Sequence, residues 1–274
     1  MNELVRLFPD EDFRHHLTLR RGDPREYFRP RDPGAWLLAE RRQWLEQDPA
    51  RYAALEPAGE GAWREVCQRV EQWGVAAGPV TDAGRPVCLG GLMEPDLLVL
   101  VRDPAGLWRL RGGALCFPTS WSLEEKLGRS IDEIHGPVPG LNAALGPSVH
   151  QILGRLSADT TVERWNWGLA ATPELNLHPA RHMPVPALPV RLESLWLRLE
   201  HQALIALPRS GGVLFGIRVA LHRLDSLVGT EAGRGLARAL DSMPPEMAEY
   251  KRVERVRPAV AKALVSSADA GSGK

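Results

Sequence analysis

Residues 195–207 read Leu-Trp-Leu-Arg-Leu-Glu-His-Gln-Ala-Leu-Ile-Ala-Leu and alternate between two kinds of side chain. The odd positions are apolar except for His201, whereas the even positions include Arg198, Glu200 and Gln202. Successive side chains of a β-strand point to opposite faces of its sheet. The stretch therefore predicts a strand with one apolar face and one face that carries adjacent opposite charges.

Two further segments, 162–171 and 212–224, alternate in the same manner. An antiparallel sheet with one solvated face explains this pattern. Alternatively, short helices cover the polar face, which then holds a ligand against Arg198, Glu200 and Arg218. Both interpretations stay open at this point.

The rest of the chain supplies two more strands and several helices. Segments 97–101 and 107–117 predict a strand pair. Helix-capping patterns then begin at Ser122 and Ser130, and Ser148 predicts the start of a third helix. The order predicts an α+β fold with a five-stranded antiparallel sheet, short helices inserted after the second strand, and flanking N- and C-terminal helices.

We divide the chain into three parts by composition. Residues 1–35 are rich in Arg, Asp and Pro and predict an irregular N-terminal arm. Residues 36–265 show no break in composition and predict a single domain with helical extensions. Residues 266–274 are small and polar, which predicts a disordered tail.

Charge and cysteine content exclude several functional classes. Lys plus Arg and Asp plus Glu both number 34, which argues against a nucleic-acid or membrane-surface binder. Three cysteines cannot supply a disulfide framework or a four-thiolate cluster. The first residues lack a signal-peptide pattern and no apolar run approaches about 20 residues, so we expect a cytoplasmic protein.

Common nucleotide and hydrolase motifs are absent from the sequence. The nearest approach to a dinucleotide loop, Gly233-Arg-Gly235, lacks the final glycine and follows no predicted strand. The chain contains no Cys-x-x-Cys, His-Glu-x-x-His or Gly-x-Ser-x-Gly sequence. These absences argue against nicotinamide or ATP binding by this chain.

Two histidines are candidate metal ligands. His135 ends a short predicted helix directly before Gly-Pro-Val-Pro, a rigid exit that fixes where the imidazole points. The ordinary role for such a residue is to interact with the last helix carbonyls. His150, at the edge of an apolar stripe, is the alternative ligand.

Six stretches together resemble one known family. They are Cys116-Phe-Pro-Thr-Ser-Trp121, Glu125-Lys-Leu-Gly128, Ile134-His-Gly-Pro-Val-Pro139, Arg164-Trp-Asn-Trp167, Arg198-Leu-Glu-His-Gln-Ala-Leu204 and Phe215-Gly-Ile-Arg218. In this order and spacing the chain resembles the alpha, haem-binding subunit of the haem-dependent oxidative N-demethylases, which oxidise dimethylamine. The resemblance covers roughly residues 30–260.

The resemblance implies a PAS-like haem-binding fold and a heme b (haem b) cofactor whose iron is held by histidine. It implies a small secondary amine and O2 as substrates. NADPH, FMN and an iron–sulfur cluster are implied on a separate reductase subunit, and a folate-binding partner would accept the one-carbon product. We accordingly expect a homo- or hetero-oligomer.

The resemblance also implies roles for individual residues. His135 becomes the first choice for the iron ligand, and Trp121 and Asn166 become part of the cofactor site. Arg198 and Arg218 would polarise oxygen. Glu200 would hold the ammonium substrate or relay a proton.

The chain departs from the family pattern in the strand 195–207. Family members commonly read Arg-x-Glu-Arg-Gln-Thr-Leu, whereas this chain has His201 and Ala203 at the second Arg and the Thr. Both lie on the apolar side of the predicted strand, so the polar face is expected to be intact. A haem-binding PAS-type gas or redox sensor without turnover is the alternative function.

Overall fold

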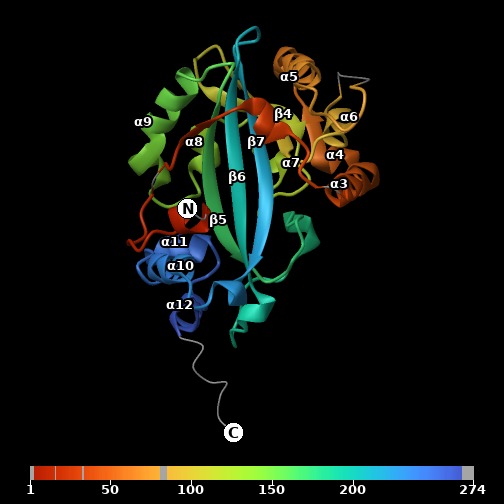
Figure 1. The fold of residues 1–274 in the computed structure, drawn as a ribbon. Coiled ribbons are helices and arrows are strands. Elements are labelled where there is room, and N and C mark those ends of the chain that lie inside the picture. The colour runs from red at the N-terminus through yellow and green to blue at the C-terminus, as the bar shows by residue number, and fades with distance from the viewer. Residues whose placement is uncertain (1–2, 16, 33, 81–84, 267–274) are drawn as a thin grey trace.

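The computed structural model describes residues 3–266 except 16, 33 and 81–84. Its centre is a seven-stranded antiparallel sheet in the order β1-β5-β6-β7-β3-β4-β2 (Figure 1). The strands are β1 (Arg20–Gly22), β2 (Ala53–Leu55), β3 (Asp96–Arg102), β4 (Trp108–Ala114), β5 (Thr161–Ala170), β6 (Trp196–Leu207) and β7 (Gly212–Arg223).

The five expected strands are five adjacent members of this sheet, β5-β6-β7-β3-β4. The expected number of strands is wrong, because β1 and β2 add one strand at each edge. Each of these two strands has only three residues, too few for a period-two pattern to be recognised in the sequence. The helices expected after the second long strand lie between β4 and β5.

The register of β5, β6 and β7 defines two faces of the sheet. Glu200 lies opposite Asn166 on β5 and opposite Val219 on β7. Directly opposed residues of antiparallel strands share a face. We name the side of these three residues the Glu200 face, and we name the other side, which carries His201 and Trp165, the His201 face.

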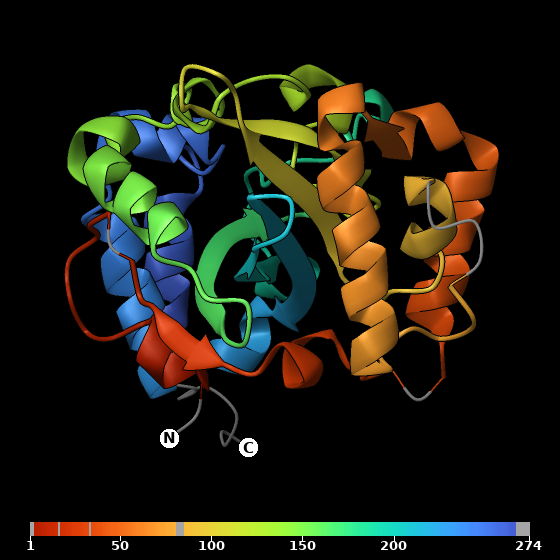
Figure 2. The same cartoon turned by 90° about the horizontal axis from the view of Figure 1, so that it is seen from above.

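Helices cover both faces. On the His201 face, α5 (Glu60–Trp73) packs on the β6 end around Ile205, whereas α10 (Glu231–Asp241) and α12 (Arg257–Val265) pack around Leu197. The Glu200 face is covered by the insertion between β4 and β5, whose Leu123 and Leu153 pack with apolar residues of β3, β4 and β7. Figure 2 shows the sheet between α9 (green) on one side and α5 (orange) on the other.

The insertion contains three helices with clear sequence signals at their starts. Ser122 caps α7 (Leu123–Lys126), and Ser130 forms a complete capping box with Glu133 at α8 (Ile131–His135). The third helix, α9 (Leu141–Gly154), begins at Gly140 in a left-handed conformation. The start expected at Ser148 is therefore wrong, because the helix continues through Pro147.

The first 35 residues are more regular than expected. They contain α1 (Glu3–Leu7), β1 and α2 (Pro24–Phe28), and they bury Phe8, Tyr27 and Phe28. The remaining helices are α3 (Trp36–Gln47), α4 (Pro49–Tyr52), α6 (Pro86–Gly90) and α11 (Pro245–Tyr250). In the described part of the chain, none of the helices has the length and apolar character needed to cross a bilayer. The tail expected at 266–274 lies, from residue 267 onward, outside the described residues.

Candidate functional site

Glu200 lies in the middle of β6 and is 6% exposed. Its Oε1 accepts a hydrogen bond from Thr119 Oγ1 at 2.5 Å. Its Oε2 accepts hydrogen bonds from Gln202 Nε2 at 2.8 Å and Asn166 Nδ2 at 3.3 Å. A carboxylate has about four acceptor positions. The structure thus brings Asn166 and Glu200 together and leaves Glu200 one position for a further donor.

Arg198 shares the Glu200 face, but its donors are directed at the protein. Its Nε donates to Thr119 Oγ1 at 2.8 Å, and Nη2 donates to the carbonyls of Phe117 and Leu175, each at 2.8 Å. Burial lowers the pKa of Arg198 to about 10, partly opposed by the charge of Glu200. The guanidinium fixes two loops and orients Thr119, whose hydroxyl in turn donates to Glu200.

Arg218 is not part of this cluster. It lies opposite His201 in the β6–β7 register, so the expectation that it shares a face with Arg198 and Glu200 is wrong. Its Nη1 forms an ion pair with Glu94 at 2.7 Å, and Nε and Nη2 donate to the carbonyls of Tyr27 and Arg29. Arg218 therefore holds the N-terminal arm against the His201 face.

His135 is half-buried at the end of α8, and its imidazole has no hydrogen-bond partner among the described residues. Burial, followed by the positive charge of Arg164, lowers the pKa of His135 to about 4. The ring is therefore neutral near pH 7, which is the protonation state that binds a metal. Arg164, whose charge acts on His135, lies on the Glu200 face, since it pairs with Gln202 in the β5–β6 register.

His150 has a partner that His135 lacks. Its Nε2 lies 2.9 Å from Asp132 Oδ1 and 3.1 Å from Oδ2, and both side chains are partly exposed. The carboxylate orients this ring in the manner seen behind many metal-bound histidines. Within the described residues, His135 is the one of the two rings whose nitrogens have no hydrogen-bond partner.

Two cations near Glu200 were not among the expected site residues. They are Arg164 on β5 and Lys251 after α11, and the negative charge of Glu200 partly offsets the lowering of both pKa values by burial. Lys251 Nζ donates to the Trp167 carbonyl at 2.5 Å and lies 4.8 Å from the Trp167 ring centre. Burial lowers the pKa of Lys251 to about 8, and Glu200 opposes this shift. Glu200 therefore lies in a surplus of positive charge.

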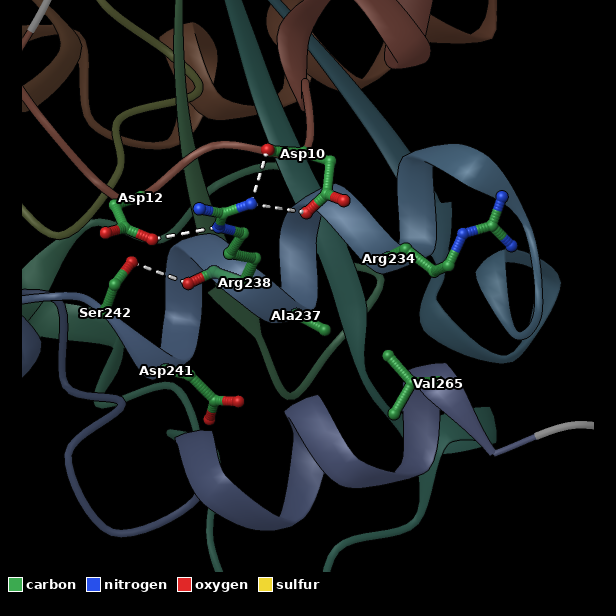
Figure 3. Close-up of a pocket in the computed structure, with 8 residues that line it drawn as sticks. All are labelled: Asp10, Asp12, Arg234, Ala237, Arg238, Asp241, Ser242 and Val265. Atoms are coloured by element: carbon green, nitrogen blue, oxygen red, sulfur yellow. Dashed lines mark hydrogen bonds and ion pairs between the residues drawn. The ribbon is translucent and has the colours of Figure 1, made fainter.

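A surface hollow of about 530 Å³ lies elsewhere, between the N-terminal segment, α10 and the end of α12 (Figure 3). Arg238 crosses it, with Nε 2.9 Å from Asp12 Oδ1 and Nη1 3.2 Å from Asp10 Oδ1. None of the residues around Glu200 lines it. The paired charges of this hollow, Arg238, Asp10 and Asp12, are exposed to solvent. Arg198 and Glu200 are buried, so we place the candidate site there.

A comparison with protein families matches residues 83–261 to the model described as haem-dependent oxidative N-demethylase, alpha subunit-like. The chain belongs to this family. The description of the N-demethylase family indicates haem dependence and oxidoreductase activity, and "alpha subunit" implies an assembly of several subunits.

The residues present fit the haem that this N-demethylase family requires. Neutral imidazole is a usual axial ligand of haem iron, and His135 offers one with no competing partner among the residues described. The insertion also contributes partly buried apolar side chains. Trp121, Ile134 and Val149 pack against the apolar residues of β3, β4 and β7 that lie beneath the insertion. Trp121 thus lies on the expected side of the sheet.

The sequence contained a signal for one of the two missed cations. Arg164 precedes Asn166 by two residues and so shares its face. Lys251 had no local signal, because α11 reaches β5 only through the tertiary fold. Thr119 was also missed, since it follows β4 in a loop and meets Glu200 across 81 positions of sequence.

Proposed function

We propose that this chain is the haem b-bearing subunit of an oxidative N-demethylase that removes a methyl group from a small secondary amine such as dimethylamine. The observation that carries the proposal is the half-buried imidazole of His135, which has no hydrogen-bond partner among the described residues and feels the charge of Arg164 on the Glu200 face. Haem, when bound, would supply the oxygen-activating and electron-accepting chemistry. A PAS-like fold is part of the proposal, supported by the helices inserted after the second long strand.

Glu200 would bind the amine. Thr119, Gln202 and Asn166 occupy three acceptor positions of the carboxylate, so an amine N–H can take the fourth. The three donors also hold the carboxylate in one orientation, which keeps the methyl group of a bound amine in one place. Arg198 acts indirectly in this arrangement, because it positions Thr119.

Electrons would come from another subunit. We propose a reductase partner that carries FMN, an iron–sulfur cluster and the NADPH site. The three cysteines support this division, since they cannot hold a four-cysteine cluster. A cytoplasmic location belongs to the same proposal.

The test begins with the absorption spectrum of the chain expressed with a haem precursor. We expect a Soret band that His135→Ala abolishes and that His150→Ala, the matched control, leaves in place. A band lost only in His150→Ala would reassign the ligand. Absence of a band in the unsubstituted chain, with the fold intact by circular dichroism, would contradict haem binding.

The second step separates enzyme from sensor. With O2 and an added reductase, dimethylamine should release formaldehyde, and Glu200→Gln should raise the KM for the amine by about tenfold, since a charge-assisted hydrogen bond is lost. Arg223→Gln, a control that removes an exposed charge of β7 paired with Asp225, should leave this KM unchanged. Haem binding without formaldehyde release would favour the sensor.

A further inference from the structure

The guanidinium of Arg164 is partly buried, and its Nε has no hydrogen-bond partner among the described residues. Its side chain forms no hydrogen bond, ion pair or aromatic contact among the described residues, and its Nε is fully buried. Burial lowers the pKa of Arg164, and the charge of Glu200 only partly opposes this shift. A buried polar atom without a hydrogen-bond partner destabilises a folded protein, so a compensating role for Nε is expected.

Three other arginines have acceptors from the protein, although Nη2 of Arg41 is also buried without a hydrogen-bond partner among the described residues. Arg41 forms an ion pair with Asp96 at 2.6 Å, and Arg218 forms one with Glu94 at 2.7 Å. Arg198 donates to backbone carbonyls and Thr119. Arg164 differs from all three, although the same fold could have supplied acceptors to it.

The surroundings of Arg164 favour an anion. Glu200, whose charge acts on Arg164, forms no ion pair with it in the described part of the chain and already accepts three hydrogen bonds. Lys251 adds a second positive charge close by, and His135 is neutral near pH 7. Glu200 thus acts on two cations, Arg164 and Lys251, and a ligand with a carboxylate of its own would offset the second charge.

We infer that Arg164 binds a carboxylate of a ligand held on the Glu200 face. A guanidinium matches a carboxylate with two parallel hydrogen bonds, which favours this anion over a spherical one. The inference rests on the proposed function, which supplies the ligand that would carry the carboxylate. That source is a haem propionate or the carboxylate of an N-methyl amino acid substrate, and the chemistry at Arg164 is the same.

The first experiment uses the haem-free chain. Sodium acetate should raise its thermal unfolding midpoint above that in sodium chloride of equal ionic strength. Arg164→Gln should abolish the difference without lowering the midpoint in chloride, because the substitution removes an unpaired buried charge. Arg191→Gln, an exposed control, should behave like the unsubstituted chain. A fall in the midpoint of Arg164→Gln in chloride, with the acetate effect intact, overturns the inference.

The second experiment identifies the source of the carboxylate. If it is a propionate, haem dimethyl ester should bind the unsubstituted chain about tenfold or more weakly than haem, and Arg164→Gln should bind both equally. If it belongs to the substrate, the ester and haem should bind equally. In that case N-methylglycine should perturb the Soret band of the unsubstituted chain but not that of Arg164→Gln. Dimethylamine should perturb the band of both.

The two proposals fail in different ways. A chain that binds no haem contradicts the proposed function, yet the acetate experiment still decides the role of Arg164. A chain that binds haem, its ester and both amines with no dependence on Arg164, and shows no acetate effect, overturns the inference alone.

Discussion

Replacing Arg218 by methionine tests the assignment of this residue to the His201 face. Its side chain is 11% exposed and its partner Glu94 only 1% exposed. Glu94 also accepts hydrogen bonds from the backbone N–H groups of Arg31 and Asp32. Burial alone would raise the pKa of Glu94, but Arg218 and these N–H groups hold it below its ordinary value.

The cost of Arg218→Met follows from these contacts. Removing one partner of a buried ion pair destabilises a protein by about 3–5 kcal/mol. Glu94 keeps its backbone donors, which favours the lower end, whereas the two carbonyl contacts of Arg218 add about 1 kcal/mol each. We therefore expect a loss of about 3–5 kcal/mol, with haem and amine binding unchanged.

Urea unfolding of Arg218→Met, Glu94→Gln and the double variant provides the assay. The double variant should be more stable than the sum of the single losses predicts, by about 1.5 kcal/mol or more. Arg223 lies on the same strand as Arg218 and forms an exposed ion pair with Asp225 in the turn after β7. Arg223→Met should lower the free energy of unfolding by less than about 1 kcal/mol. A loss below about 1 kcal/mol for Arg218→Met, or weaker amine binding at unchanged stability, would refute the assignment.

Three further predictions concern pH and helix capping. Burial would raise the pKa of Glu163, but hydrogen bonds from its neighbours lower it to about 2, so its stabilisation of about 3 kcal/mol should disappear as the pH falls from 4.5 to 2. Urea midpoints over this range should fall less steeply in Glu163→Gln, and equal slopes would contradict the reasoning. The pKa of Lys251 is lowered to about 8, so between pH 8 and 10.5 the unfolded chain binds the extra proton and stability should rise with pH. Lys251→Met, measured by the same titration, should lack this rise. Ser130→Ala should destabilise the protein by about 1 kcal/mol through loss of the α8 cap, whereas Ser148→Ala, inside α9, should change thermal stability little.

Strands β5, β6 and β7 were predictable from sequence because each alternates between apolar and polar or small residues over seven or more positions. The sequence showed which residues of one strand share a face, but not which residues of neighbouring strands do. Leu207 pairs with Gly212 across the β6–β7 turn, so odd positions of β6 lie opposite even positions of β7. Asn166 pairs with Glu200, so β5 and β6 keep the same parity. A pattern within one strand contains no information about this pairing, and Arg218 was misplaced for that reason.

The candidate site was predictable where its residues share a strand. Arg198 and Glu200 are two residues apart, and the structure keeps them together. What each guanidinium contacts depends on loops far away in sequence, such as those of Phe117 and Leu175. The alternation therefore identified Arg198 as polar but could not show that its donors are already occupied.

The hydrogen bonds of Arg198 have a consequence for how the insertion is built. Phe117 lies just before the inserted helices and Leu175 lies beyond β5, and the segments 118–120 and 177 run side by side. The guanidinium thus closes the base of the insertion without a covalent link. Helices α7, α8 and α9 lie between this base and β5. A change in the length of these helices would alter which molecules fit beneath them without changing the register of the sheet.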